Sequence, residues 1–453
     1  MFSDVLEKIS WDETTQKIAS KTDADVVRAL AKERLDVDDF MALISPAAVP
    51  HLEEMARLSQ KYTQERFGKT ISMYIPLYLS NACTNFCVYC GFNHNNPFTR
   101  TTLNDAQILE ECKAIRKLGP FENLLIVTGE APAVAGVDYL ENALHIARPF
   151  FNNLSIEVQP LKADDYYRLT KSGLNGVVCF QETYHKESYE QLHPTGPKHN
   201  YAWHTEAMDR AMEGGIDDVG LGVLFGLELY RYEFAGLLMH AEHLEAVHGV
   251  GPHTISVPRV KHADDIDPDE FDNGIDDDTF IKIIACIRIA VPYTGMIIST
   301  RENQEVRARA LHVGISQISG ASRTSVGGYV EPEPEEENSA QFDVSDNRTL
   351  DEVVQWLMGM GYIPSFCTAC YRAGRTGDRF MSLCKAGEIQ NCCHPNALLT
   401  LQEFLLDYAS PETRAIGEKV IAEQLKQIPR DNVRQKTEEY LAQMEHGERD
   451  FRF

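Results

Sequence analysis

Short apolar stretches alternate with longer amphipathic ones through the middle of the chain. Eight stretches have the composition and length of buried strands, and most are followed by a segment with the 3.6-residue periodicity of a helix. Apolar strands that alternate with helices indicate a parallel sheet whose outer face is covered by the helices. We expect these strands at Ile75–Ser80, Leu124–Thr128, Leu154–Val158, Gly176–Phe180, Val219–Val223, His253–Val257, Met296–Ser299 and Ile315–Ser319.

Eight such units over about 250 residues match the size of a closed (β/α)8 barrel of the TIM type. An open, doubly wound sheet is the alternative that the pattern by itself leaves open. The chain has helical spacing between most of the strands, for example over Thr205–Gly214, Phe234–Val247 and Asp277–Val291. We therefore predict an α/β fold with a barrel over residues 71–330.

The chain on either side of the barrel follows other patterns. Residues 1–70 are charged and have helical spacing, which predicts an N-terminal helical segment. Glu331–Asp343 is acidic and proline-rich, which predicts a solvated linker. Beyond it we expect a helix over Leu350–Met360, a cysteine-rich stretch over Phe366–Pro395 and a helical tail. Residues 331–453 are thus expected to form a C-terminal domain.

Composition restricts the range of functions. The 453 residues include 43 Lys and Arg against 68 Asp and Glu, for a net charge of −25. This charge argues against a nucleic-acid partner, since such proteins need a basic surface. No apolar run approaches a membrane span, and the first residues lack the plan of a signal peptide, so a cytoplasmic protein is expected. In that compartment the 11 cysteines are expected to be metal ligands or buried thiols rather than disulfides.

Three cysteines follow the first predicted strand in the sequence NACTNFCVYCGF. Cys83, Cys87 and Cys90 have the spacing C-x3-C-x2-C, and Cys83 lies just past the carboxyl end of the strand, where barrel active sites are built. Thiolates select iron–sulfur clusters, zinc or copper. A zinc site would need a fourth nearby ligand, for which the sequence offers only His94. Three thiolates on a cluster would instead leave one iron open to a bidentate ligand.

This spacing resembles that of the radical S-adenosylmethionine (SAM) superfamily. Tyr89 precedes the last cysteine and is a candidate catalytic residue, and Val127–Glu130 follows the second strand, where the superfamily has a glycine-rich contact to SAM. The resemblance implies that the open iron binds SAM, and that one electron cleaves its S–C5′ bond to release a 5′-deoxyadenosyl radical. Gly129 and Glu130 are then candidate cofactor-binding residues, with an ordinary loop turn as the alternative.

A second group of cysteines lies in the C-terminal stretch: Cys367, Cys370, Cys384, Cys392 and Cys393. The first, second and last have the spacing C-x2-C-x22-C, again three ligands with one position open. A structural zinc ribbon, with Cys384 or His394 as the fourth ligand, is the alternative. Because Cys392 adjoins Cys393, the third ligand stays open between them. His253 begins the sixth strand and is expected at the mouth of the barrel opposite Cys83.

Longer phrases resemble the HydG family, the tyrosine-cleaving maturases of [FeFe]-hydrogenases. They include LHPTGPKHNY, VPYTGMIISTRE, ISQISGASRTSVGGY and GYIPSFCTACYRAGRTGDRFMSLCKAGEIQNCC, and together they span about three quarters of the chain. The nearest relative is the 2-iminoacetate synthase of thiamine biosynthesis, which shares the barrel and the first cysteine group but lacks the second.

The resemblance implies a carbon–carbon lyase that cleaves L-tyrosine into p-cresol and dehydroglycine. It implies a SAM-binding 4Fe-4S cluster on the first cysteine group and an auxiliary 4Fe-4S cluster on Cys367, Cys370 and Cys393. His253 would help to hold an extra, labile iron beside the auxiliary cluster, with free L-cysteine as a bridging ligand. There the two-carbon fragment would become CO and cyanide on iron, for assembly of the hydrogenase H-cluster.

Two arginines are candidates to bind the tyrosine carboxylate, because a guanidinium group matches a carboxylate in two hydrogen bonds. Arg323, past the eighth strand, is preferred, and Arg301, past the seventh, is the second choice; either could instead form a structural ion pair. For Arg210 a solvated helix face is an equal alternative. The candidates for contact with SAM are Gln181, Glu182, His204 and Arg210.

The family resemblance also implies partners, namely other hydrogenase maturases and an electron donor such as flavodoxin or ferredoxin. Two other functions stay open: a tyrosine lyase that stops at dehydroglycine for thiazole synthesis, and a non-catalytic iron–sulfur scaffold.

With the cysteine groups at opposite mouths of the barrel, roughly 17–20 Å or more apart, a fragment made at one must pass through the interior. The sequence therefore predicts a polar-lined channel.

Overall fold

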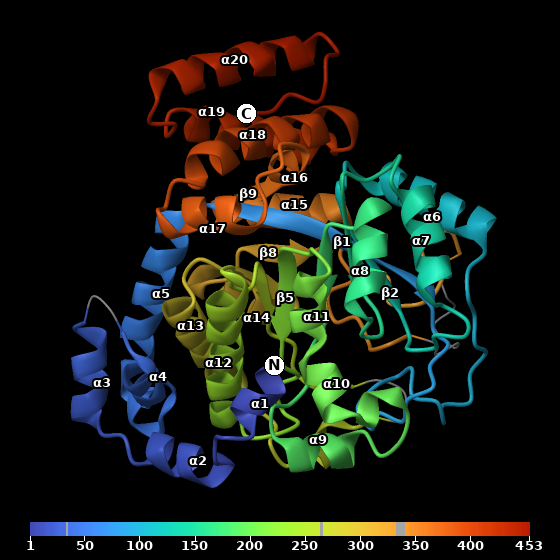
Figure 1. Ribbon diagram of the computed structural model, residues 1–453. Helices are drawn as coiled ribbons and strands as arrows, with labels where there is room; N and C mark the ends of the chain where they lie inside the picture. The colour runs from blue at the N-terminus through green and yellow to red at the C-terminus, as the bar shows by residue number, and fades with distance from the viewer. Residues whose placement is uncertain (33–34, 263–265, 332–339) are drawn as a thin grey trace.

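Figure 1 shows a computed structural model of the protein, which describes residues 1–32, 35–262, 266–331 and 340–453. Eight parallel strands close into a barrel, because β1 pairs with β2 on one side and with β8 on the other. The predicted (β/α)8 barrel is confirmed. Its strands are β1 (Thr70–Ser80), β2 (Asn123–Thr128), β3 (Asn153–Glu157), β4 (Gly176–Val178), β5 (Asp218–Gly222), β6 (Thr254–Ser256), β7 (Gly295–Ile298) and β8 (Gln317–Ser319).

The first strand is longer than its apolar run predicts. It begins at Thr70 rather than Ile75, and over its first residues only alternate side chains, such as Ile71 and Met73, are buried. The continuous apolar run therefore marks only the second half of β1, where both faces are covered. The extra length matters because β1 reaches past the other strands toward the C-terminal part of the chain.

Helices surround the barrel, as expected for a parallel sheet. The helix predicted over Thr205–Gly214 is divided at Glu206, where α10 ends and α11 begins. The helices that follow the strands are α6 (Asp105–Leu118), α7 (Val137–Ala147), α8 (Ala163–Lys171), α9 (Lys186–Leu192), α10 (Tyr201–Thr205), α11 (Ala207–Glu213), α12 (Tyr230–His248), α13 (Asp277–Ala290) and α14 (Gln304–Val313), with the short 3-10 turns η2 (Pro197–His199) and η3 (Pro268–Glu270).

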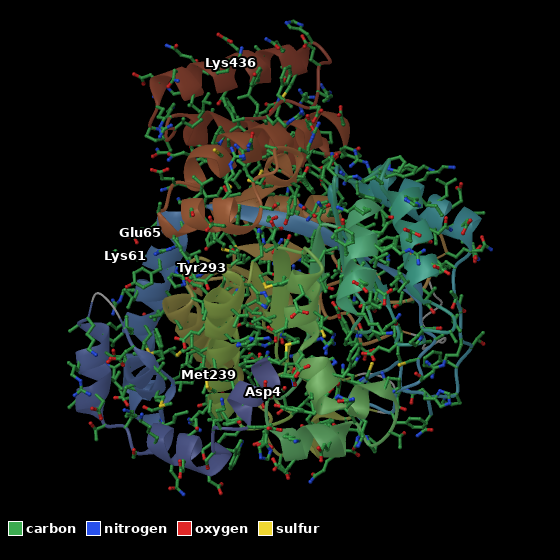
Figure 2. All side chains as sticks on the ribbon, viewed as in Figure 1. Asp4, Lys61, Glu65, Met239, Tyr293 and Lys436 are labelled. Carbon is green, nitrogen blue, oxygen red and sulfur yellow. The ribbon has the colours of Figure 1, made fainter. Side chains whose placement is uncertain are left out.

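The N-terminal segment is helical, as predicted, and lies against one side of the barrel (Figure 1). Its longest helix, α5, buries Met55, Ser59 and Thr63 on one face. Lys61 and Glu65 point away from the barrel (Figure 2), with 3.8 Å between their charged atoms. The elements are α1 (Phe2–Leu6), α2 (Trp11–Ala19), α3 (Asp23–Leu30), α4 (Val37–Ile44), η1 (Pro46–His51) and α5 (Leu52–Phe67).

The C-terminal part is joined to the barrel by a ninth strand, which the sequence pattern did not predict. β9 (Ile363–Ser365) pairs in parallel with the start of β1, so that Ser365 lies opposite Ser72. The helices after it stack on this end of the barrel (Figure 1). The elements of this part are α15 (Leu350–Gly359), β9, α16 (Ala369–Arg372), α17 (Gly377–Lys385), α18 (Gln390–Asp407), α19 (Pro411–Leu425) and α20 (Asp431–Glu445).

The segment predicted to be a solvated linker, Glu331–Asp343, lies outside the described residues over 332–339. Its end packs on the barrel: Tyr78 donates a hydrogen bond to Gln341 Oε1 at 2.7 Å, and Phe342 is buried. The linker prediction is wrong for these residues, because their side chains cover the carboxyl end of β1.

The division of the chain at residues 70 and 330 stays a prediction. Within the described ranges, every helix is too short or too polar to cross a lipid bilayer.

Candidate active site

A cavity of about 220 Å³ runs through the interior of the barrel. Its wall includes Cys83, just past the carboxyl end of β1, and also Asn123 and Asp218, the first residues of β2 and β5. The cavity thus reaches from the carboxyl ends of the strands to their amino ends, and the predicted channel is confirmed. The strands contribute hydroxyl and amide side chains to the cavity wall, along with apolar ones such as Val177: Ser155, Thr254, Ser256, Gln317 and Ser319.

The first cysteine group lines the carboxyl-end mouth of this cavity. Arg100 holds the loop that carries it, donating hydrogen bonds to the carbonyl oxygens of Asn81 at 2.8 Å and of Phe92 at 2.9 Å. Burial raises the pKa of all three thiols, that of Cys90 to about 11. Soft donors out of water are what an iron–sulfur cluster requires.

The zinc alternative for these thiols depends on a fourth ligand, for which the sequence offered His94. Its Nδ1 instead lies 3.0 Å from the carbonyl oxygen of Cys83. In the described ranges, no three His, Cys, Asp or Glu side chains are grouped as ligands of a single metal ion. Three thiolates are a donor set that an iron–sulfur cluster accepts.

Gly129 and Glu130 connect the loop after β2 to the cysteine loop. A side chain at Gly129 would overlap the carbonyl oxygen of Ala82 and lie 3.2 Å from Cys83 Cβ, so only glycine allows this approach. The carbonyl oxygen of Glu130 accepts a hydrogen bond from Thr84 N at 3.0 Å, and its carboxyl group accepts one from Asn85 at 2.8 Å. Both predicted residues lie in the cavity wall beside Cys83.

Glu182 and Lys198 form a buried ion pair in the cavity wall, with 2.7 Å between Nζ and Oε1. Burial disfavours the ammonium group, but Glu182 is foremost among the neighbours that raise the pKa of Lys198 well above its usual value, so the cation persists. The Lys198 ammonium lies 5.8 Å from the ring centre of Tyr89, whose hydroxyl is hydrogen-bonded to His193 at 2.6 Å. Glu182 has a φ of 67°, which strains a residue that is not glycine.

The two candidate arginines lie in different places. Arg301 lines the cavity, stacks 3.8 Å above the ring of Phe342, and has a buried Nε that lacks a hydrogen-bond partner in the described chain. Arg323 is exposed, although its neighbours Ser322 and Thr324 line the cavity. The structure therefore favours Arg301 over the preferred Arg323 as an anchor for a carboxylate inside the barrel.

The remaining predicted SAM contacts differ in their positions. His204 lines the cavity; it donates from Nε2 to the carbonyl oxygen of Phe180 at 2.7 Å, and burial lowers its pKa to about 3, so the ring is neutral. Gln181 instead turns its amide toward Thr205 at 3.0 Å, outside the cavity wall. Arg210 also lies outside it and donates to the carbonyl oxygen of Leu161 at 2.9 Å. For these last two residues the structure indicates a structural role.

Sequence reasoning missed several residues of this cavity. Glu157 is the last residue of β3, and burial raises the pKa of its carboxyl group to about 7. Its place at the carboxyl end of a barrel strand is a signal that could have identified it. Lys198 lies on η2, outside any strand, and nothing in the local pattern points to it. Six residues of the cavity wall each carry a buried polar atom with no hydrogen-bond partner in the described chain: Thr128 Oγ1, Asn153 Oδ1, His204 Nδ1, Thr300 Oγ1, Arg301 Nε and Ser322 Oγ.

The second cysteine group lies at the other end of the barrel. Cys367 follows β9, whose Ser365 is opposite Ser72 of β1, whereas Cys83 follows Ser80 at the far end of the same strand. Ser72 and Ser80 are eight positions apart on β1, or about 26 Å at the rise of a strand. The prediction that the two groups occupy opposite mouths is confirmed, at a somewhat larger separation.

His253 lies at this second mouth, as predicted. Its ring stacks on Phe380 of α17 at 4.4 Å, and its Nδ1 lies 3.3 Å from Asp218 without a hydrogen-bond partner among the described residues. Tyr371, next to Cys370, donates a hydrogen bond to Asp218 at 2.6 Å. His253 is thereby placed beside the cysteine group, with ring nitrogen available to a metal.

Burial raises the pKa of Cys367 to about 12, and it raises the pKa values of Cys370 and Cys393 as well. After burial itself, Cys370 and Cys367 are the neighbours that most raise the pKa of Cys393, so the three predicted ligands lie near one another. Cys392 lies 3.9 Å from Arg375, and Cys384 is fully buried. The donor set fits an iron–sulfur cluster at this end as well.

Comparisons with known proteins place this arrangement in a family. The radical SAM superfamily model matches residues 77–238, and the biotin and thiamin synthesis associated domain matches residues 256–363. A crystal structure of HydG, a maturase of the [FeFe]-hydrogenase, is 42% identical with a TM-score of 0.94, over 98% of this chain and 99% of that one. The chain belongs to the HydG family of radical SAM enzymes. The resemblance read from the sequence is confirmed.

Two further relatives show how much of this chain each similarity covers. HydG from Carboxydothermus hydrogenoformans is 33% identical with a TM-score of 0.78, over 97% of both chains. The 2-iminoacetate synthase of Escherichia coli (strain K12) is 40% identical over 365 residues, which are 80% of this chain and 95% of that protein. The HydG likeness thus extends over nearly the whole chain, whereas the likeness to 2-iminoacetate synthase leaves a fifth of it unmatched.

Proposed function

We propose that the protein cleaves L-tyrosine at the carboxyl-end mouth of the barrel and forms CO and cyanide at the other mouth, for [FeFe]-hydrogenase maturation. The observation that carries this proposal is a single polar cavity between two three-cysteine groups. A lyase with one active centre would have no use for a second group of three cysteines at the opposite mouth of the barrel. A reaction in two stages needs both sites and a path between them.

At the first mouth, Cys83, Cys87 and Cys90 would hold a 4Fe-4S cluster. With SAM bound, such a cluster supplies the 5′-deoxyadenosyl radical. The surrounding side chains provide orientation and exclude water. Arg301 would hold the tyrosine carboxylate, and Gly129 allows the loop after β2 to pack closely against the loop that carries Cys83.

At the second mouth, Cys367, Cys370 and Cys393 would hold the auxiliary cluster. His253 would help to retain the labile iron, with free L-cysteine as a bridge. Its unpaired ring nitrogen and the buried thiols supply the donor set that this site needs. The assembled product would then pass to other maturases, and an electron donor such as flavodoxin or ferredoxin would serve the first cluster.

The second candidate function is a 2-iminoacetate synthase, which would stop at dehydroglycine. The 40% identity to that enzyme supports the shared first stage. The ninth strand and the cysteines after it favour the longer reaction, because they build a donor set around the far end of the cavity.

The proposal is tested on the anaerobically reconstituted protein with SAM, L-tyrosine, L-cysteine, Fe²⁺ and dithionite. We expect 5′-deoxyadenosine and p-cresol in equal amounts, together with CO trapped on deoxymyoglobin and with cyanide. p-Cresol without CO or cyanide would assign the shorter reaction. Failure to cleave SAM would instead leave the scaffold function. Iron and sulfide content, with electron paramagnetic resonance before and after SAM addition, counts the clusters.

A further inference from the structure

The base of the cavity, at the amino ends of β2, β3 and β5, is lined by a short chain of polar groups that the proposed chemistry has not used. Asn123 and Asn153 begin β2 and β3, and Asp218 begins β5. All three are at most 7% exposed and line the cavity. Burying three polar side chains costs free energy unless they are paired or serve a ligand.

The hydrogen bonds determine which atoms face the cavity. Asn123 donates from Nδ2 to the carbonyl oxygen of Met73 at 3.2 Å, and a carbonyl can only accept. The Oδ1 atom of Asn123 is therefore the acceptor, and Asn153 donates to it from Nδ2 at 3.1 Å. This leaves Asn153 Oδ1 buried with no hydrogen-bond partner in the part of the chain described. This unpaired acceptor belongs to a residue of the cavity wall.

Tyr371 separates this base from the second cysteine group. Its side chain lines the cavity and donates a hydrogen bond to Asp218 Oδ2 at 2.6 Å. Immediately behind it lie Cys370, its neighbour in the chain, and His253, with 6.2 Å between the two rings. A molecule that leaves the cavity at this end must pass Tyr371 and the two acceptors beside it.

We propose that Asn153, Asp218 and Tyr371 form a binding subsite for a small molecule that carries hydrogen on nitrogen, an amine or a protonated imine. Asn153 Oδ1 and the Asp218 carboxylate are both acceptors, so they match an N–H donor and repel a carboxylate. The positive groups of the cavity, Arg301 and Lys198, line its wall at the opposite mouth. A dehydroglycine molecule would therefore travel with its nitrogen leading and its carboxylate behind. This inference rests on the proposed function for the identity of the ligand.

Whether the subsite binds an N–H donor or a carboxylate can be tested without the enzymatic reaction, by soaking crystals of the full chain in small probe molecules. Methylammonium chloride is one probe and sodium formate is the other. We expect methylammonium between Asn153 Oδ1 and Asp218, and formate only at the mouth near Arg301. Formate at the base, or a base that stays empty in methylammonium, would overturn the assignment.

The role in transfer is tested with Asn153→Leu and Tyr371→Phe, and with Tyr408→Phe as the control. Tyr408 donates to the carbonyl oxygen of Arg116 at 3.3 Å on the outside of the barrel, so its hydroxyl is remote from the path. For Asn153→Leu we expect p-cresol formation within about two-fold of the unsubstituted protein, and at least about a ten-fold fall in CO and cyanide per p-cresol. Glyoxylate, the hydrolysis product of dehydroglycine, should appear in solution instead. Tyr371→Phe should shift the same ratio, and Tyr408→Phe should leave it unchanged.

The outcomes separate the two proposals. If the unsubstituted protein makes no p-cresol, the proposed function fails. If it makes p-cresol, CO and cyanide, and both test variants keep the same ratio, the subsite proposal fails while the function stands. If Asn153→Leu does not fold, Tyr371→Phe and the crystal soaks decide, because neither replaces a strand residue.

Discussion

The two arginines Arg301 and Arg210 differ in their position relative to the cavity. Arg301 lines the cavity wall, whereas Arg210 lies outside it and donates from Nε to the carbonyl oxygen of Leu161. Each keeps one buried guanidinium nitrogen without a partner among the described residues, and an unpaired buried donor costs about 1–3 kcal/mol. Because only Arg301 can reach a ligand inside the barrel, we propose it, and not Arg210, as the group that binds a carboxylate there.

Replacing Arg301 with Gln should weaken tyrosine binding, because a neutral amide cannot form the charge-assisted pair with a carboxylate. We expect kcat/KM for L-tyrosine to fall by at least about ten-fold, since such bonds contribute about 1.5–3 kcal/mol. The measurement is the rate of p-cresol formation at varied L-tyrosine. Arg323→Gln is the matched control and should change kcat/KM by less than about two-fold. A larger effect of Arg323→Gln would return the anchor to that residue.

Gly129→Ala should destabilise the loops that hold the first cysteine group. The added methyl group would overlap backbone rather than a movable side chain, which costs about 1–3 kcal/mol. We expect the melting temperature to fall by a few degrees and the iron content after reconstitution to decrease. Gly359→Ala is the control, because its added methyl meets no heavy atom within 4 Å in the described chain. Equal behaviour of the two variants would contradict the steric argument.

At the scale of elements, α12 secures the strained loop after β4. Glu233 on this helix accepts hydrogen bonds from the Tyr184 backbone N–H at 2.8 Å and from the Thr183 hydroxyl. These contacts hold the turn at Glu182, which pairs with Lys198 in the cavity wall. Burial raises the pKa of Glu233 to about 8, so at neutral pH its carboxyl group keeps its proton.

This shift predicts a pH dependence of stability. Between the ordinary value of 4.5 and about 8, the folded protein holds a proton at Glu233 that the unfolded chain releases. Stability therefore falls as pH rises through this window, by about 1.4 kcal/mol per pH unit, and the fall ends above pH 8. Glu233→Gln, which is neutral at every pH, removes this contribution.

We expect the melting temperature of the unsubstituted protein to decrease by a few degrees more than that of Glu233→Gln between pH 6 and pH 8. Differential scanning calorimetry of both proteins in the same buffers measures the difference, in which contributions from other groups cancel. Parallel curves would show that Glu233 is already ionised in the folded state.

At the scale of the whole molecule, the barrel holds the two cysteine groups apart, with the cavity between them. β1 spans the distance between them, since its carboxyl end leads into the first cysteine group and its amino end pairs with β9 before the second. Under the proposed function, this separation would allow one radical reaction and one metal-based reaction to proceed without exchanging ligands. The cavity keeps the intermediate away from solvent.

Removing either site should therefore affect different products. Cys87→Ser should abolish 5′-deoxyadenosine, p-cresol, CO and cyanide together. Cys393→Ser should keep p-cresol within about three-fold and lose CO and cyanide, since one ligand fewer destabilises the auxiliary cluster by roughly 1.4 kcal/mol or more. Cys392→Ser is the matched control, and it should retain all four products. If Cys392→Ser has the effect expected of Cys393→Ser, the third ligand is Cys392.

The sequence by itself determined the barrel, the helical flanks and both cysteine groups. These features depend on spacing along the chain: buried strands are continuous apolar runs, and each close cysteine pair lies within a few residues. Predictions from the local sequence failed where segments far apart in the chain pack against one another. Gln341 and Phe342 were assigned to a linker because their neighbours are acidic, yet both pack on the barrel. The preference for Arg323 over Arg301 as the carboxylate anchor stays a prediction.

Only the tertiary structure decided which side chains share the cavity. Tyr78 and Gln341 are 263 positions apart, and Asp218 and Tyr371 are 153 apart, yet each pair is hydrogen-bonded. Such contacts form because the closed barrel and the added strand β9 bring residues from distant parts of the chain together. Local sequence patterns do not predict these contacts. The cavity that runs from the first cysteine group toward the second is thus a property of the fold, built from residues whose immediate sequence context is ordinary.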